Sequence, residues 1–131
     1  MEMKDSALGD FEATVLASLL NLGGTSYGVP IREEVEAAEG RLITIGALYI
    51  TLDRMEKKGY VRSWESDPTP ERGGRSKRFY ILEGSGEAAL RAKQEEYSRR
   101  ANRLAEGLKR APVQGIILLA ANVGRRLCYG R

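Results

Sequence analysis

Residues 44–82 read TIGALYITLDRMEKKGYVRSWESDPTPERGGRSKRFYIL. The first part of this stretch, 44–58, places apolar side chains at steps of three and four, namely Ile45, Leu48, Leu52 and Met55. That spacing predicts an amphipathic helix with one buried face. Thr44 is a suitable N-cap and Gly59 a suitable C-terminal stop. The opposite face, with Tyr49 at its flank, carries Gly46, Ile50, Asp53, Arg54 and Lys57.

Two short strands follow this helix. Residues 60–66 alternate and are rich in β-branched and aromatic side chains, and 76–82 read in the same way. Between them, 67–74 is a loop of turn-forming residues. Four cations surround its glycines Gly73 and Gly74, namely Arg72, Arg75, Lys77 and Arg78. The pattern predicts a β-hairpin with a basic tip, in which the glycines let the backbone turn and approach a partner closely.

Working toward the N-terminus, 8–22 and 27–38 each show apolar residues at helical spacing, separated by the glycines of GGTS at 23–26. The chain therefore reads helix, helix, helix, strand, basic loop, strand. This is the order of a winged helix-turn-helix, in which the third helix enters the DNA major groove. The predicted fold class is mostly α (α+β), with a two-stranded wing and a long C-terminal helix. The wing cations would neutralise phosphates or enter a narrow minor groove.

Working toward the C-terminus, 85–108 is helical, with a narrow heptad stripe that suits packing on another long helix. The stripe consists of Leu90, Tyr97, Ala101, Leu104 and Leu108. Pro112 ends the pattern, and 113–123 is an apolar run that would enlarge a dimer interface or form a tail. We therefore expect a DNA-binding domain at 1–84 and a helical dimerisation region at 85–131.

Composition narrows the function classes. The chain of 131 residues has a net charge of +3 and a pI near 9.1, which permits nucleic-acid binding without requiring it. It has no histidine, the commonest general base and metal ligand, and no clustered metal ligands are visible. The single cysteine, Cys128, cannot form an internal disulfide, and we see neither a secretory signal nor a membrane span. We expect a cytoplasmic protein that is not an enzyme and has no metal or cofactor.

Three stretches carry a family resemblance: LGDFEATVLASLLNLGGTSYGVPIREEVE (8–36), IGALYITLDRMEKKGYV (45–61) and TPERGGRSKRFYIL (69–82). They resemble the PadR-like transcriptional regulators. The resemblance implies a homodimer on a palindromic operator, acting as a repressor, joined through the C-terminal helix and often released by a small effector. The chain departs from the family at Pro30, and at Glu83-Gly84, where relatives commonly carry Thr-Pro. Ser85 is then the expected N-cap of the last helix.

Several residue roles stay open. Thr44 could cap the helix, contact phosphate or do both, and Gly46 would let the helix start approach the DNA backbone. The resemblance puts Tyr49 at the DNA surface, where its hydroxyl would bind phosphate. Ile50 would touch a thymine methyl or is an incidental surface residue. We expect Asp53 to pair with Arg54 or Lys57, the alternative being acceptance from a cytosine amino group.

The rival interpretation is a winged-helix protein-interaction module without DNA binding, since a fold does not fix a function. The sequence alone selects neither an operator nor an effector. It also does not give the sign of regulation, a role for 112–131 or a redox role for Cys128.

Overall fold

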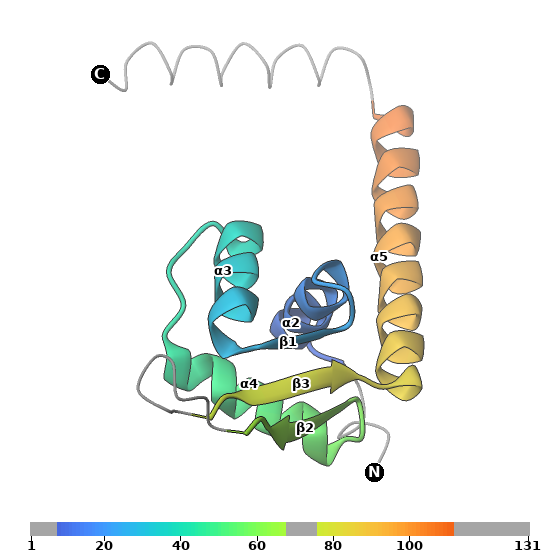
Figure 1. The fold of residues 1–131 in the computed structure, drawn as a ribbon. Helices are drawn as coiled ribbons and strands as arrows, with labels where there is room; N and C mark the ends of the chain where they lie inside the picture. Colours follow the sequence, from blue (N-terminus) through green and yellow to red (C-terminus); the bar gives the residue numbers. More distant parts are fainter. Residues whose placement is uncertain (1–7, 68–75, 112–131) are drawn as a thin grey trace, which may run out of the picture. The chain divides into compact units, whose positions relative to one another are not determined.

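A computed structural model describes residues 8–67 and 76–111. The helices and strands follow the predicted order, with one additional strand between the first two helices (Figure 1). In chain order they are α2 (Asp10–Asn21), β1 (Thr25–Tyr27), α3 (Gly28–Glu39), α4 (Ile45–Lys57), β2 (Val61–Glu65), β3 (Arg78–Leu82) and α5 (Gly84–Arg110). The described part of the chain thus has the predicted mostly-α winged helix-turn-helix fold.

The sheet is antiparallel, with strand order β1-β3-β2. Strands β2 and β3 form the predicted hairpin, and Ser63 lies opposite Tyr80 in its register. Strand β1, which the sequence analysis did not expect, pairs with the other edge of β3 and sets Ser26 opposite Tyr80. Helices α2 and α3 contact β1, and α4 contacts β2 (Figure 1). The wing is therefore anchored to the helices through β1.

The core lies between these helices and the inner face of the sheet. Its fully buried side chains come from α2, α3, α4 and β3. The largest are Val15, Leu16, Leu19, Ile31, Val35, Leu48, Leu52, Met55 and Tyr80. This confirms most of the apolar stripes of the first three predicted helices. Leu20 is an exception, because it is 44% exposed. Ile45 is another, because it lies in the first turn of α4 and is 37% exposed.

The ends of α4 follow the predicted chemistry. The Thr44 hydroxyl oxygen accepts a hydrogen bond from the Ala47 N–H at 3.1 Å, which satisfies a backbone donor that the helix itself leaves unpaired. At the other end Gly59 has a φ of +84°, a left-handed conformation that favours glycine. These two residues fix where α4 begins and ends, and hence which side chains it presents.

Helix α5 begins at Gly84, so Ser85 is not its N-cap as expected but lies inside the first turn. Its hydroxyl donates instead to the Gly59 carbonyl oxygen. Gly86 is buried, and a Cβ at this position would overlap the Tyr60 carbonyl oxygen. The described residues divide into two compact units, the first reaching into α5 as far as Gln94 and the second beginning at Glu95. The domain boundary at residue 84 stays a prediction.

Candidate nucleic-acid interface

Helix α4 presents one uninterrupted solvent-exposed face. Gly46, Ile50, Asp53 and Lys57 follow each other at steps of four, three and four, and all four are exposed. Ile50 is 62% exposed, although it is a large apolar residue. The opposite face, with Leu48, Leu52 and Met55, is fully buried. The helix is therefore held firmly from behind while its outer face is free to contact a partner.

The start of α4 is open. Thr44 is exposed and uses its hydroxyl oxygen as the helix cap, which leaves the hydroxyl proton free to be donated to a phosphate. Within residues 8–67 and 76–111, nothing apart from the helix backbone and the two chain neighbours lies within 4 Å of the place where a Cβ of Gly46 would stand. Since the fold itself leaves room for a side chain at Gly46, any need for glycine there would come from a bound partner.

Tyr49 lies at the edge of this face and is half-buried. Its ring centroid is 6.4 Å from that of Tyr80, and its hydroxyl lies against Gly28, the first residue of α3. A side chain at Gly28 would collide with that hydroxyl. Packing therefore fixes the Tyr49 ring, and phosphate contact by its hydroxyl stays a prediction.

Beside Tyr49 a small open hollow of about 250 Å³ lies between α4 and β3, lined by Tyr49, Asp53, Arg78 and Tyr80. The Tyr80 hydroxyl has no hydrogen-bond partner in the described part of the chain. Burial raises the pKa of Tyr80 to about 12, although the nearby Arg78 acts in the opposite direction. Tyr80 therefore stays protonated at neutral pH.

Arg54 has a partner that the sequence analysis did not find. Its guanidinium lies 3.5 Å from the carboxylate of Glu12, which also accepts from the Lys58 ammonium at 3.0 Å and from the Gly9 N–H at 2.8 Å. The expected pairing of Asp53 with Arg54 or Lys57 is wrong, because neither cation lies within 4.0 Å of its carboxylate in the described part of the chain. The burial of Glu12 could have been predicted from the sequence, because it stands four residues from the apolar residues Leu8 and Leu16 at helical spacing. Its pairing with Arg54 could not.

Glu12 makes stability depend on pH. Burial raises the pKa of its carboxyl, but the Gly9 N–H, Lys58 and Arg54 together lower it below 4.5. A carboxyl whose pKa is lower in the folded state than in the unfolded state stabilises the protein at pH values above its unfolded-state pKa. This stabilisation is lost as the pH falls through the folded-state pKa. We expect Glu12→Gln to unfold about 1–2 kcal/mol more easily at pH 7, with a smaller difference below pH 4.5, in urea titrations at one protein concentration.

The matched control is Glu33→Gln, which removes the same charge from an exposed position of α3. It should change the free energy of unfolding little at either pH. A Glu12→Gln difference that stays constant from pH 7 to pH 3 would show that the ionised carboxylate does not stabilise the fold.

Only some of the predicted wing residues belong to the part of the chain that the structure describes. Lys77 is half-buried, and its ammonium lies over the Tyr27 ring, 4.2 Å from the centroid. Arg78 donates to the Ser63 hydroxyl at 3.0 Å and lies 3.8 Å from the Glu56 carboxylate. The remaining predicted wing residues, which lie outside the described ones, are Arg72, Gly73, Gly74 and Arg75.

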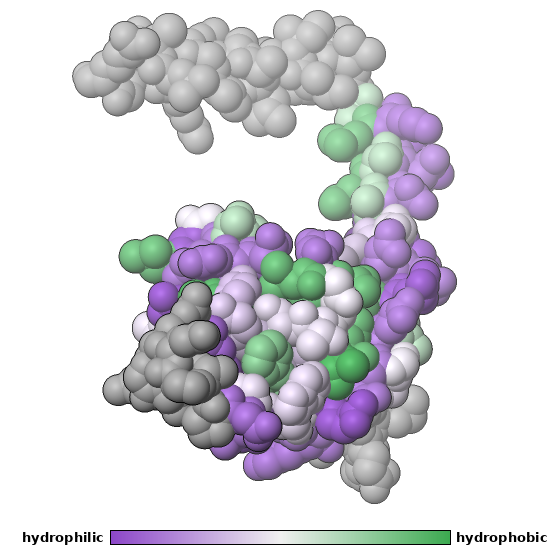
Figure 2. All heavy atoms as spheres, in the orientation of Figure 1, coloured by the Kyte–Doolittle hydropathy of each residue, from purple (hydrophilic) through white to green (hydrophobic). Residues whose placement is uncertain are grey.

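Three aromatic rings lie in register across the outer face of the sheet. Phe79 of β3 lies opposite Tyr27 on one side and Trp64 on the other, with ring centroids 5.4 and 5.7 Å away. Figure 2 shows weakly polar and hydrophobic surface over the sheet, bordered by strongly hydrophilic surface. Trp64 is 44% exposed, so its packing on Phe79 stabilises the wing at the surface and not within the core. Cross-strand aromatic pairs of this kind stabilise a hairpin.

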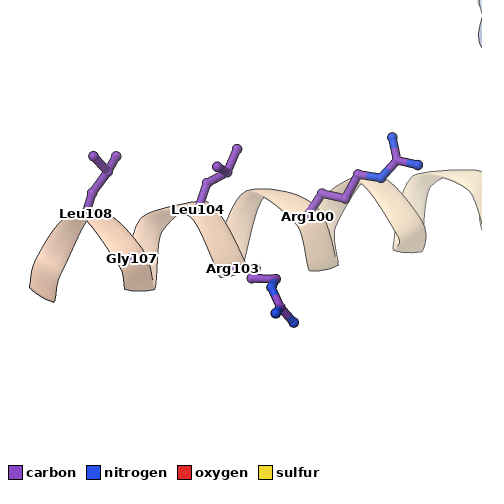
Figure 3. A pocket seen from close by; sticks show the side chains of 5 residues that line it. All are labelled: Arg100, Arg103, Leu104, Gly107 and Leu108. Carbon is purple, nitrogen blue, oxygen red and sulfur yellow. The ribbon is translucent and has the colours of Figure 1, made fainter. Parts of the chain in front are cut away.

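The predicted dimer stripe divides between the two units. Leu90 belongs to the first unit and packs, half-buried, against the core of the same chain. In the second unit Leu104 and Leu108 are 70% and 68% exposed, and Ala101 and Tyr97 are exposed as well. Figure 3 shows Leu104 and Leu108 on one side of α5, together with Arg100, and Arg103 on the other side. The end of α5 thus carries a narrow apolar stripe that faces solvent, with a charged residue beside it.

The comparison with known families is decisive. The model of the transcriptional regulator PadR-like family matches residues 15–92, which include α3, α4 and all three strands of the sheet. The chain belongs to the PadR-like family of transcriptional regulators. No curated protein matches it closely enough to add to this.

Solved structures place this PadR-like regulator among its relatives. A PadR family transcription regulator from Clostridium difficile is 23% identical, with a TM-score of 0.60 over 76% of this chain and 99% of that one. The protein smu.1704 from Streptococcus mutans is 26% identical, with a TM-score of 0.60 over 76% and 87%. The complex structure of hsRosR-S1 is 26% identical, with a TM-score of 0.57 over 88% and 94%.

The described residues of this PadR-like regulator give no support for a metal site or for a membrane-spanning helix. Residues 8–67 and 76–111 contain no group of three or more side chains that could hold a metal ion. Within the same ranges, no helix combines the length and the apolar character that crossing a membrane requires.

Proposed function

We propose that this PadR-like regulator is a sequence-specific DNA-binding protein that acts as a dimer on a palindromic operator. The observation that supports this most is the outer face of α4, which is exposed from Gly46 to Lys57 although the helix is buried behind. An α-helix presented in this way fits the major groove. Thr44, Gly46, Tyr49, Ile50 and Lys57 are the residues that would contact the half-site.

Arg54 has a second role in this proposal. Its side chain is 54% exposed even though it pairs with Glu12, so part of the guanidinium can still contact phosphate. The pair would hold Arg54 in one orientation before DNA arrives, which reduces the entropy lost on binding. Lys77, with Arg72, Gly73, Gly74 and Arg75 of the wing loop, would bind the flanking backbone.

The dimer is supported by the exposed apolar stripe at the end of α5. Leu104 and Leu108 stand one turn apart, and burying them against a partner helix removes apolar surface from water. Two copies joined in this way would present two α4 helices to successive major grooves, about 34 Å apart. Repression, release by a small effector and a place in the cytoplasm are the further parts of the proposal that come from the family.

Selection of bound fragments from random duplexes tests the function. We expect a palindromic site bound with a Kd of about 10⁻⁸–10⁻¹¹ M, and a steep loss of affinity as salt rises. Arg72→Ala and Arg75→Ala together should lower both the affinity and the salt slope. A protein that retards no duplex even at low salt would instead be a protein-interaction module.

Gly46 offers a prediction in which stability and binding move in opposite directions. Gly46→Ala should raise the free energy of unfolding by up to about 1 kcal/mol, because alanine is the better helix former and nothing obstructs its methyl group. DNA affinity should fall, since the same methyl group keeps the helix start away from the DNA backbone. Thermal melts and binding titrations measure both. An unchanged affinity would remove Gly46 from the interface.

A further inference from the structure

Asp53 stands on the outer face of α4, where a phosphate-binding surface would not be expected to carry a negative charge. It lies three residues after Ile50 and four before Lys57, and it is exposed. It also forms one wall of the hollow that it shares with Tyr49, Arg78 and Tyr80. Its carboxylate is therefore presented on the surface that would approach DNA.

The cations near Asp53 have other acidic partners. Arg54, the next residue, pairs with Glu12, and Arg78 on the far side of the hollow lies near Glu56 and Glu65. Among the described residues no ion pair within 4.0 Å joins Asp53 to Lys57. The carboxylate is thus held on the outer face without being neutralised by an internal salt bridge.

A carboxylate can only accept hydrogen bonds, and phosphates repel it. The hydrogen-bond donors that the major groove offers are the amino groups of cytosine and adenine. In an A·T pair the adenine amino group lies between two acceptors, N7 of adenine and O4 of thymine. In a G·C pair the cytosine amino group has an acceptor, O6 of guanine, on one side only. A carboxylate therefore meets less repulsion at cytosine.

We propose that Asp53 is a specificity-determining residue of this regulator, accepting a hydrogen bond from the amino group of one cytosine in each half-site. This inference rests on the proposed function. It has a second consequence for DNA without the operator. There the carboxylate finds no fixed donor and faces phosphates, so it weakens non-specific binding.

The experiment selects bound fragments from random duplexes with three full-length proteins: wild type, Asp53→Ala and Asp53→Asn. Wild type should require cytosine at one position in each half-site, related by the operator's two-fold symmetry. Asp53→Ala should lose this preference, by about five- to a hundredfold in relative affinity, and keep the other positions. Asp53→Asn should turn the preference toward adenine, which asparagine recognises through N6 and N7. Both variants should bind unrelated duplexes several-fold more tightly than wild type.

Glu33→Gln is the matched control, because it removes one exposed carboxylate from α3 and leaves α4 intact. It should leave the selected site unchanged. Circular dichroism melts check that each variant folds. We expect both Asp53 variants to fold, because Asp53 is exposed. Identical selected sites for wild type and both Asp53 variants would overturn the inference while leaving the proposed function standing. A wild type that selects no site at all would overturn both.

Discussion

Leu104→Asp together with Leu108→Asp should convert the protein to monomers and reduce operator affinity by about 10²–10⁴-fold. The two leucines form the most exposed part of the apolar side of α5, and aspartates there would have to be buried without partners in a dimer. A monomer binds one half-site and loses the gain from linking two. Sedimentation equilibrium and binding titrations on the same samples measure the two effects.

Ser98→Asp together with Asn102→Asp is the control for that variant. It adds the same two charges to exposed positions of α5 that lie outside the apolar stripe. It should remain dimeric and lose much less affinity, since only general repulsion from DNA is added. If the leucine variant stays dimeric, α5 does not join the two copies through this stripe. If it is monomeric yet binds the operator normally, the dimer is not needed for recognition.

Gly86→Ala should lower the free energy of unfolding by about 3 kcal/mol. Its methyl group would overlap the Tyr60 carbonyl oxygen and crowd the Leu82 side chain, and a backbone atom cannot move aside as a side chain can. The variant would push the start of α5 away from the strands that it follows. Urea unfolding at one fixed protein concentration measures the change.

Gly84→Ala, two residues earlier in the same helix, is the control. In the part of the chain that the structure describes, nothing beyond its own helix backbone and chain neighbours lies within 4 Å of its Cβ position, so the variant should be as stable as wild type or up to about 1 kcal/mol more stable. Equal effects of the two substitutions would mean that helix propensity, and not close packing at Gly86, determines the result.

The elements that the sequence predicted correctly are those with a clear period. Helix α4 has an apolar step of three and four, a capping threonine and a terminal glycine, and all three signals agree with its observed bounds. Strand β1 carries no such signal, because three residues are too short to show an alternation. It exists through pairing with β3, more than fifty residues away, as the opposition of Thr25 and Ile81 shows.

The candidate site, too, could be predicted only in part from the sequence. The exposed positions of α4 could be read from its helical spacing, since periodicity alone determines which residues share a face. The partners of those residues could not. Arg54 and Glu12 meet because α2 and α4 pack together, and no local pattern links two residues so far apart in sequence. Close packing at Gly28 and Gly86 could not be predicted either. A glycine can stand at a position for several different reasons, and the sequence alone does not distinguish them.

The central claim is that the outer face of α4 reads DNA. The most direct test is an amide NMR titration of the full chain with the duplex obtained by selection. We predict the largest shift changes between Thr44 and Lys57 and around Lys77, with small changes in α2. Changes confined to the outer face of the sheet or to the end of α5, with α4 unaffected, would contradict the claim.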